Sequence, residues 1–490
     1  MNCGTWWRFA LVLALALVLI GESPLRAQQQ PIAAPSAPQS SASSAVDLDA
    51  LAQEATGWLT DLIRINTTNP PGNELPAAKY IAGVLDKEGI ASEVIEVEPG
   101  RGIVVARLQA GAMADPSQAL LLLGHLDVVG VDASKWSVDP FAAVTRDGYL
   151  YGRGAIDDKG MVAANLAVFI AIKRSGMRLG RDVVFLADDD EEQGGSASIK
   201  PVIAKYWDKF ACGYALNEGG LVTLASGKVK YVAVQSSEKV PYNVTVTARG
   251  TSGHASRPLP DNAVVHLAAA IAKIGAYDAP AEPTAVTLRY FEGLAPIEDD
   301  DTGKWMRAVD QPERLELAVN HLGDMNPAWG AMLHDTIVPT MLEAGVRVNV
   351  IPSEAHANLN IRLMPGDSIQ QIIAQLTKTV ADSQISFDLA PDSGENAPAS
   401  SLDSPLYKTI ERIAPQDFPG AVVVPELSTG ATDSAQLRLH NVQSFGLLPF
   451  PLTDEDESRS HADDERIPTA SIRPGVAFLY HVVSSFVQAQ

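Results

Sequence analysis

The sequence predicts an α/β protein in which one larger domain is interrupted by a smaller one. Over residues 48–235, short apolar runs alternate with stretches of helical periodicity, as in sheets whose strands are connected by helices. Near residue 240 the pattern changes, because VPYNVTVTARG alternates apolar and polar residues with a period of two, which is typical of a half-buried antiparallel strand. From Ser368 the first pattern resumes and continues to an apolar helix over 472–488.

The larger domain is expected to hold a mixed sheet flanked by helices. Two of its strand-like runs are apolar almost without interruption, which is typical of strands covered on both faces. The expected strands lie at 102–108, 119–129, 182–187 and 214–216. The expected helices of the first segment lie at 51–65, 77–88, 160–175 and 197–207.

The smaller domain is expected to be an α+β insertion over 239–366 that acts as a lid or a dimerisation unit. It divides the larger domain into the segments 46–238 and 367–490. A helix is expected over 263–277, and VRVNVIPSEAHANLNIRLMPG predicts two strands joined by a turn at Pro352. The alternation of this segment fits a sheet with one solvated face.

The first residues predict export. Arg8 precedes an apolar run over 9–20, which is short for a membrane span, and Ala27 offers a small residue for cleavage. We therefore expect a signal peptide over 1–27, a disordered linker over 28–45, and a periplasmic or secreted protein without a stable membrane anchor. An uncleaved membrane anchor is the alternative.

Composition narrows the function classes. The chain has 490 residues and a formal net charge of −22, which argues against nucleic acid and anionic membrane surfaces as partners. Its two cysteines are Cys3 and Cys212, so a cysteine-based metal site is not expected.

Residues with metal-binding side chains follow the expected strands. In LLLLGHLDVV, His125 and Asp127 close an apolar strand with a spacing that points both side chains the same way. In YGRGAIDDKG, glycines surround Asp157 and Asp158 ahead of a helix. Each motif alone also has a structural explanation: a buried His–Asp pair in the first case, and acids near a helix N-terminus in the second.

Further acids complete the pattern. The run LADDDEEQGG places Glu191 and Glu192 just past a strand, NEGG places Glu218 after another, and SRSHADDERIP supplies His461 in a polar loop. A solvated strand end would explain one such run, but crowded carboxylates are tolerated best beside a cation. Carboxylates mixed with imidazoles suit Zn²⁺, Co²⁺ or Mn²⁺.

Six motifs taken in order resemble one family. GHLDVV, GRGAIDDKG, DDEEQGGSAS, NEGG, TSGHAS and SHADDERIP are similar to the motifs of the dinuclear metallopeptidases that include aminoacylases, glutamate carboxypeptidases, acetylornithine deacetylases and carnosinases. The resemblance covers almost everything from about residue 48 onward. It implies a discontinuous metallopeptidase domain with an inserted lid and two zinc ions, with cobalt or manganese as other possible metals.

The resemblance also implies a ligand set. Asp157 would bridge the two metal ions. His125 and Glu218 would complete the site of one ion, and Glu192 and His461 the site of the other. Each of these residues occupies the position of the matching family motif.

Five more residues take roles from the resemblance. Asp127 would orient a ligand histidine, and Glu191 would be the general base for an activated water. His254, in GTSGHAS, would reach the oxyanion of the reacting carbonyl. Arg362 and Asn349 match residues that bind the carboxylate end of a substrate. Because His254 lies in the inserted domain, either domain closure or a dimer partner is expected to bring it to the site.

The expected function is hydrolysis of amide or peptide bonds in small substrates with a free carboxylate, of the carboxypeptidase or dipeptidase type. An N-acyl amino acid deacylase is the alternative, with acetylornithine or succinyl-diaminopimelate as examples of its substrates. A non-catalytic binding protein is the alternative from another class, and a two-metal phosphoesterase is a further one. A homodimer is possible, and the side-chain specificity is open.

Overall fold

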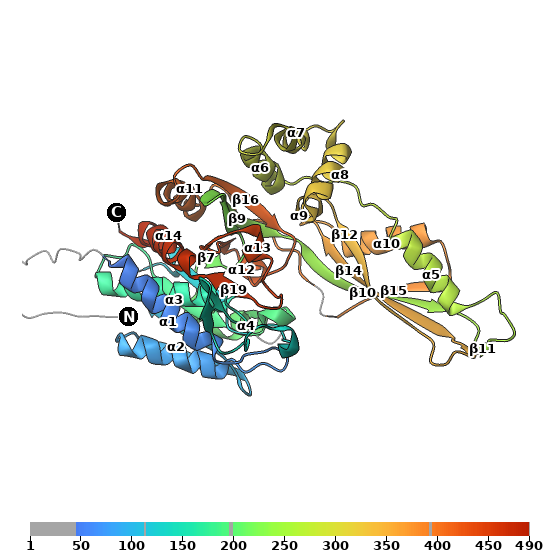
Figure 1. Ribbon diagram of the computed structural model, residues 1–490, viewed down its shortest axis with the longest axis horizontal. Helices are drawn as coiled ribbons and strands as arrows, with labels where there is room; N and C mark the ends of the chain where they lie inside the picture. Colours follow the sequence, from blue (N-terminus) through green and yellow to red (C-terminus); the bar gives the residue numbers. More distant parts are fainter. Residues whose placement is uncertain (1–45, 112–113, 196–198, 392–393, 490) are drawn as a thin grey trace, which may run out of the picture. The chain divides into compact units, whose positions relative to one another are not determined.

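The computed structural model describes residues 46–111, 114–195, 199–391 and 394–489, and its largest element is a mixed sheet (Figure 1). The sheet follows the order β1 (Ser92–Glu98), β2 (Arg101–Leu108), β6 (Val183–Asp188), β3 (Leu120–His125), β7 (Tyr214–Asn217), β17 (Gln443–Gly446), β9 (Lys228–Glu238), β8 (Leu221–Ala225) and β18 (Pro451–Leu452), and β16 (Val422–Ser428) pairs with β9. β3, β6, β7 and β17 pair in parallel, whereas β1 pairs antiparallel with β2, β2 with β6, and β8 with β9. The predicted mixed sheet is confirmed.

Helices cover both faces of this sheet because alternate residues of the central strands point to opposite sides. Leu120 and Leu122 of β3 belong to one core, and Leu121 and Leu123 belong to the other. The first core is closed by α1 (Leu48–Ile63), α2 (Leu75–Lys87), α3 (Lys159–Ser175), α11 (Pro405–Asp417) and α14 (Thr469–Val487). The second is closed by α4 (Ile199–Phe210) and α12 (Ser434–Leu439). Two-sided burial explains the continuous apolar runs.

The inserted unit is a separate antiparallel sheet. Its order is β12 (Thr336–Ala344), β14 (Glu354–Leu363), β10 (Val240–Arg249) and β15 (Ile385–Leu389). The helices α5 (Ala263–Ile274) and α10 (Ile369–Val380) pack on it and share its apolar core. An α+β unit separate from the main sheet agrees with the sequence.

The end of this unit lies further along the chain than the sequence suggests. We expected the second catalytic segment to begin at residue 367, but β15 pairs with β10 and α10 belongs to the core of the smaller sheet. The structure therefore moves the boundary beyond Leu389. Alternation of helix and strand identifies the elements, but it does not tell which of two sheets a strand joins.

The expected strand that begins at Val346 is mostly absent among the described residues. Only Val350–Ile351 is a strand there, β13, and it pairs with β11 (Gly253–His254). The long edge strand is β12, which precedes it. The sequence of β12 lacks the alternation of apolar and polar residues that marks a strand, because it contains Pro339 and several exposed apolar side chains. An edge strand tolerates both, since one of its sides has no partner strand.

Four helices between α5 and β12 belong to neither flank of the smaller sheet. They are α6 (Ala285–Leu294), α7 (Asp300–Ala308), α8 (Leu315–Met325) and α9 (Pro327–Ala331). Phe291 and Leu294 of α6 share an apolar core with Val424 and Leu427 of β16. This helical segment therefore packs on the main sheet, although the chain reaches it through the inserted unit.

The expected signal peptide and linker, 1–27 and 28–45, lie outside the described residues. Within the described part of the chain, no helix combines the length and apolar character that crossing a membrane requires.

Candidate metal and active site

The candidate metal ligands lie at one edge of three parallel strands. β3 ends at His125, β6 ends at Asp188 shortly before the acidic turn, and β7 ends one residue before Glu218. β3 pairs in parallel with both β6 and β7, so all three strands carry their last side chains to the same edge. Open α/β sheets bind their ligands at this edge.

Asp157 lies between two groups of donor atoms. Its Oδ1 is 3.0 Å from Nε2 of His125, and its Oδ2 is 3.0 Å from Nε2 of His461. On the first side, Oε2 of Glu218 is 3.6 Å from His125 Nε2. On the second side, Oε1 of Glu192 is 3.1 Å from His461 Nε2. The five side chains thus form two groups that share one carboxylate.

This donor set fits a pair of divalent cations. Carboxylate oxygens and imidazole nitrogens are ordinary ligands of Zn²⁺, Co²⁺ and Mn²⁺. The buried Oε1 of Glu218 has no hydrogen-bond partner among the described residues. Burial raises the pKa of Glu218, and the charges of Asp157 and Glu192 add to the shift, against His125. Bound cations relieve such crowding of carboxylates.

Glu191 also lies inside the cluster. Its carboxylate, the ring of His125 and the carboxylate of Glu218 place ligand atoms within 4.8 Å of one another, and so do His125, Asp157 and Glu192. Burial and then the charge of Glu218 raise the pKa of Glu191 well above its usual range. Proximity alone therefore does not separate a ligand from a proton carrier.

Asp127 holds three parts of the site at once. Nδ1 of His125 is 3.0 Å from its backbone oxygen and 3.3 Å from its Oδ1. The two carboxylate oxygens accept hydrogen bonds from the backbone N–H groups of Glu191 and Glu192, at 3.2 and 3.1 Å. Burial opposes the charge of Asp127, but the hydrogen bond with His125 holds its pKa below the usual value. An ionised Asp127 thus fixes the acidic turn relative to the histidine.

Sequence reasoning missed the support behind Asp127. The buried Asn69 donates from Nδ2 to Asp127 Oδ2 at 2.8 Å and to Asp190 Oδ1 at 3.0 Å. Arg101 donates to Asp190 at 2.8 Å and to Glu74 at 3.2 Å. The available signal was NTTNPPGNE, which contains Asn69 and Glu74 and belongs to the resemblance, although no role was assigned to it.

Glu465 was also missed, although it stands four residues after His461. Its carboxylate accepts hydrogen bonds from the backbone N–H groups of Gly154, Ile156 and Asp157, at 2.9 to 3.2 Å. Arg153 donates to it at 2.6 Å. Glu465 therefore fixes the loop that carries Asp157.

The remaining acids of the motifs are buried rather than superficial. The exposed fractions of Asp158, Asp188, Asp189 and Asp190 are 2% or less. Asp158 Oδ2 accepts a hydrogen bond from the backbone N–H of His125 at 3.3 Å. Burial and then the charge of Asp433 raise the pKa of Asp188.

Of the expected inserted-domain residues, Arg362 reaches the site. It lies on β14 and lines a cavity of about 520 Å³ together with Glu191 and His461. Lys200 and Lys239 line the same cavity. Glu238, Glu395 and Asp433 line it as well, so it is the guanidinium of Arg362, on the inserted unit, that suits an anionic substrate group there.

His254 and Asn349 do not reach it within the described chain. Neither residue lines either of the two large cavities that border the ligand cluster. They lie at the β11–β13 pair instead, where His254 pairs with Val350 and the backbone oxygen of Asn349 accepts a hydrogen bond from the N–H of Ala255. Both side chains are exposed.

The fold and site together define a metal-dependent hydrolase of the α/β class. Residues 121–485 match the family model described as Peptidase family M20/M25/M40, and the chain belongs to that family. This confirms the resemblance and the enzymatic character that the sequence predicts. Its coarse function is that of a peptidase or aminoacylase-type hydrolase.

Individual relatives differ in their described activities. A "probable carboxypeptidase S-like 2" of Dictyostelium discoideum is 29% identical over 75% of this chain and 71% of its own length. An "N-fatty-acyl-amino acid synthase/hydrolase" of Homo sapiens is 27% identical over 76% of this chain and 75% of its own length. Among solved structures, a metallo-carboxypeptidase from Sulfolobus solfataricus matches with a TM-score of 0.68 and 20% identity, over 88% of this chain and 99% of that one.

Proposed function

We propose that this chain is an exported dinuclear zinc hydrolase that cleaves the amide or peptide bond of small substrates with a free carboxylate. The observation that carries the proposal is Asp157, whose two oxygens face His125 and His461 separately, at 3.0 Å each. Zinc is the metal that the family resemblance favours, and the same donors also suit cobalt or manganese.

In this proposal Asp157 would be a ligand of both ions, His125 and Glu218 would hold one of them, and Glu192 and His461 would hold the other. Bound ions would supply Lewis acidity toward the reacting carbonyl and toward a water molecule. The ligand residues hold the ions, and their contacts with one another fix the spacing of the two groups.

Glu191 is the proposed proton carrier. It takes the proton of the attacking water and delivers it to the leaving nitrogen. Burial and then the charge of Glu218 raise the pKa of Glu191, which strengthens it as a proton acceptor. Asp127 keeps the backbone of Glu191 in place.

Arg362 is the proposed anchor for the substrate carboxylate. It is half-buried, and burial lowers the pKa of its guanidinium although Glu238 opposes the shift. Its Nε donates to Asn360, which leaves the other nitrogens to form a forked contact with a carboxylate. With the carboxylate held there, the scissile amide points toward the ligand cluster.

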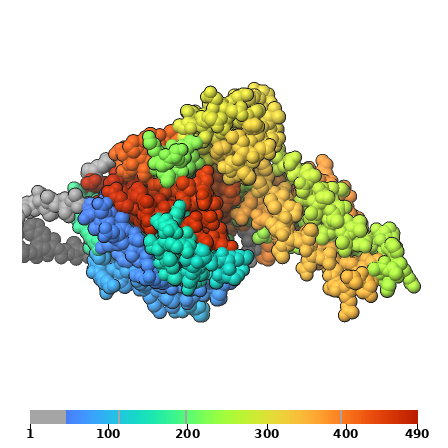
Figure 2. Space-filling model, in the orientation of Figure 1, coloured from blue at the N-terminus to red at the C-terminus, as the bar shows by residue number. Residues whose placement is uncertain are grey.

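His254 and Asn349 are proposed to act across a homodimer. β12 is the outer strand of the smaller sheet, and its residues Met341 and Leu342 are 69% and 67% exposed. Val346 and Val348 follow and are also exposed, and Figure 2 shows this stretch, in yellow to orange, at the surface. An uncovered apolar edge strand is a ready surface for pairing with a second copy.

A substrate panel tests the proposed function. The zinc-loaded enzyme is assayed on dipeptides, on N-acetyl amino acids and on C-terminally amidated versions of both, with Glu191→Gln as the control. Hydrolysis of dipeptides that disappears on amidation and in the variant supports the proposal. Hydrolysis of N-acyl substrates alone supports the deacylase alternative, which the aminoacylase and N-fatty-acyl-amino acid relatives keep open. Two bound metals without turnover of any substrate support a binding protein.

Export is tested separately by cell fractionation. The mature protein is expected outside the cytoplasm, with an N-terminus near residue 28. A cytoplasmic protein that begins at Met1 contradicts this part of the proposal.

A further inference from the structure

A second cavity borders the ligand cluster, and Arg362 is not among the described residues that line it. It measures about 570 Å³ and is lined at one end by Asp157, Glu191 and Glu218. At the other end it is lined by Trp329 and Met332, which belong to the helical segment α6–α9 and the turn after it. We call this cavity the α9 chamber. With the carboxylate half of a substrate held beside Arg362, the chamber faces the other half, on the carbonyl side of the scissile bond.

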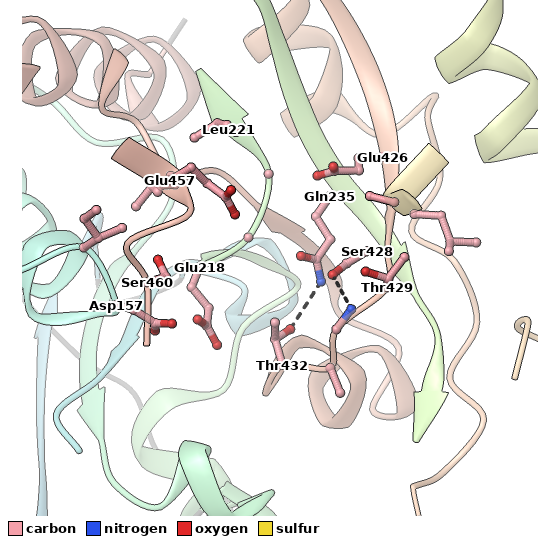
Figure 3. Close-up of a pocket in the computed structure, with 18 of the residues that line it drawn as sticks. Asp157, Glu218, Leu221, Gln235, Glu426, Ser428, Thr429, Thr432, Glu457 and Ser460 are labelled. Atoms are coloured by element: carbon pink, nitrogen blue, oxygen red, sulfur yellow. Dashed lines mark hydrogen bonds between the residues drawn. The ribbon is translucent and has the colours of Figure 1, made fainter. Parts of the chain in front are cut away.

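The chamber is acidic beyond the ligand cluster. Glu426 of β16 and Glu457 of α13 (Asp454–Glu457) face it from opposite walls (Figure 3). None of the described residues that line it is a lysine or an arginine. The neighbouring cavity, by contrast, is lined by the cations Lys200, Lys239 and Arg362 as well as by the acids Glu238, Glu395 and Asp433. Its additional charges are therefore mixed, whereas those of the described residues that line the α9 chamber are all acidic.

Glu426 lacks a cationic or hydrogen-bonding partner among the described side chains. Burial raises its pKa to about 7, and the charge of Glu457 adds to the shift. Burial also raises the pKa of Glu457, and the charges of Asp454 and Asp157 contribute. The electrostatic influence of these acids therefore extends from Asp157 through Glu457 to Glu426, and no described side chain supplies a counter-charge for Glu426.

Aromatic side chains stand beside Glu426. Trp329 Nε1 donates to the hydroxyl of Tyr290 at 3.3 Å. Burial raises the pKa of Tyr290 and of Tyr231, and the charge of Glu426 contributes to both shifts, so these rings lie close to its carboxylate. All three aromatic residues line the chamber. Aromatic faces attract cations and pack against the alkyl stems of long basic side chains.

We propose that the α9 chamber binds a basic side chain, of the lysine or arginine type, on the carbonyl side of the scissile amide. This inference rests on the proposed function. The alkyl stem packs on Tyr231, Tyr290 and Trp329, and the charged end reaches Glu426 and Glu457. A neutral acyl chain in the same place leaves the carboxylate of Glu426 without water or a counter-charge, which is costly. The chamber therefore makes the enzyme a peptidase for basic residues rather than a hydrolase of fatty acyl amides.

The test compares dipeptides that share one C-terminal residue and differ only on the carbonyl side. The series holds lysine, arginine, norleucine or citrulline there, and the N-octanoyl derivative of the same C-terminal amino acid completes it. Citrulline keeps the shape of arginine without its charge. For the zinc-loaded enzyme, kcat/KM for lysine and arginine is expected to exceed that for the neutral analogues by about ten- to a hundredfold, the range for a hydrogen bond to a charged group.

Two variants assign the preference to the chamber. Glu426→Gln removes the charge without breaking a hydrogen bond of the described structure, so it is expected to bring the ratio close to one while norleucine turnover persists. Glu455→Gln is the matched control, because Glu455 lies on the same helix as Glu457 but outside the chamber lining. This control is expected to keep the full preference.

Equal turnover of lysine and norleucine substrates, faster turnover of the octanoyl compound, or a preference unchanged in Glu426→Gln overturns the inference. Equal turnover of the lysine and norleucine dipeptides, or an unchanged preference in Glu426→Gln, leaves the proposed function intact, whereas hydrolysis of the octanoyl compound alone also favours the deacylase alternative. The proposed hydrolysis itself fails when no substrate is cleaved. In that case the affinities of the lysine and norleucine dipeptides for zinc-loaded Glu191→Gln, measured by calorimetry, decide the inference. The same ratio is expected there, and equal affinities overturn it.

Discussion

The ligand cluster and the β11–β13 pair both hold residues that the family motifs single out, but the chain completes only the first. His125 and His461 come from distant parts of the sequence, and each lies 3.0 Å from an oxygen of Asp157. His254 and Asn349 lie at the β11–β13 pair and line neither of the two cavities of the site. The topology of a parallel sheet brings its strand ends together. The exposed β11–β13 pair, by contrast, can reach a site only through a partner subunit or a domain movement.

The largest expected effect comes from inactivating the ligand cluster in one chain and the β11–β13 pair in another. His254→Ala is expected to lose about 10² to 10³ in kcat, the usual cost of one oxyanion donor, and to keep both metals. Glu191→Gln is inactive for a different reason. If His254 serves the partner subunit, mixing the two variants restores activity, up to about a quarter of the wild-type value after random exchange of subunits in a dimer.

The measurement is hydrolysis after co-refolding or co-expression of the two variants, with each variant alone as the control. Recovery shows that one intact Glu191 and one intact His254 in different chains make a working site. A mixture as inactive as its components, in a preparation proven to contain heterodimers, contradicts a site shared between subunits.

A smaller effect is expected at the ligand cluster, when the support of the loop that carries Asp157 is weakened. Glu465→Gln weakens the hold on the loop of Asp157, because three backbone N–H groups lose a carboxylate acceptor. We expect metal affinity or kcat/KM to fall by about 10- to 100-fold, as for other residues that orient metal ligands. Excess zinc is expected to restore part of the rate. Asp147→Asn, which changes an exposed acid, serves as the control, and an unchanged zinc titration for Glu465→Gln speaks against the assigned role.

The smallest effect concerns stability. The pKa of Glu426 is raised from 4.5 to about 7 in the folded chain, so between these values the folded protein holds a proton that the unfolded chain has lost. Its contribution to stability therefore falls as pH rises through this window and stays low above it. The charges that act on it are Glu457 from α13 and, once ionised, Tyr231 and Tyr290 from β9 and α6.

Glu426→Gln is accordingly expected to raise Tm at pH 8, by about 2 °C, and to change it little near pH 4.5. Thermal unfolding of the two proteins across this pH range, at fixed zinc, gives the answer. A variant less stable than the wild type at pH 8 indicates that the charge of Glu426 already has a counterpart in the protein.

The parts of the fold that were predictable from the sequence are those with a strong local pattern. Strands buried on both faces read as apolar runs, and polar residues at their ends marked where the ligands would converge, as for His125 and Glu218. The partition between the sheets was harder, because α10 has the same amphipathic pattern in either environment. β12 escaped detection since an exposed edge strand leaves no burial signature.

The supporting residues of the site show a second limit. Asn69 and Glu465 act through hydrogen bonds to residues far away in the sequence, for example over 58 positions to Asp127 and 309 positions to Ile156, and neither residue type has a periodic signal. Their motifs were visible, but their partners were not. The packing of α6–α9 on β16 is a third such case, because it depends on a long-range contact that no local rule encodes.

The most direct test of the central claim compares two neighbouring residues in one assay. Zinc content and hydrolysis are measured for Glu191→Gln and Glu192→Gln after identical loading and desalting. Glu191→Gln is expected to keep two zinc ions per chain while its kcat falls by a factor of about 10² to 10⁴. Glu192→Gln is expected to keep only one ion. Two ions in Glu192→Gln together with one in Glu191→Gln would reverse the assignment and contradict the proposed mechanism.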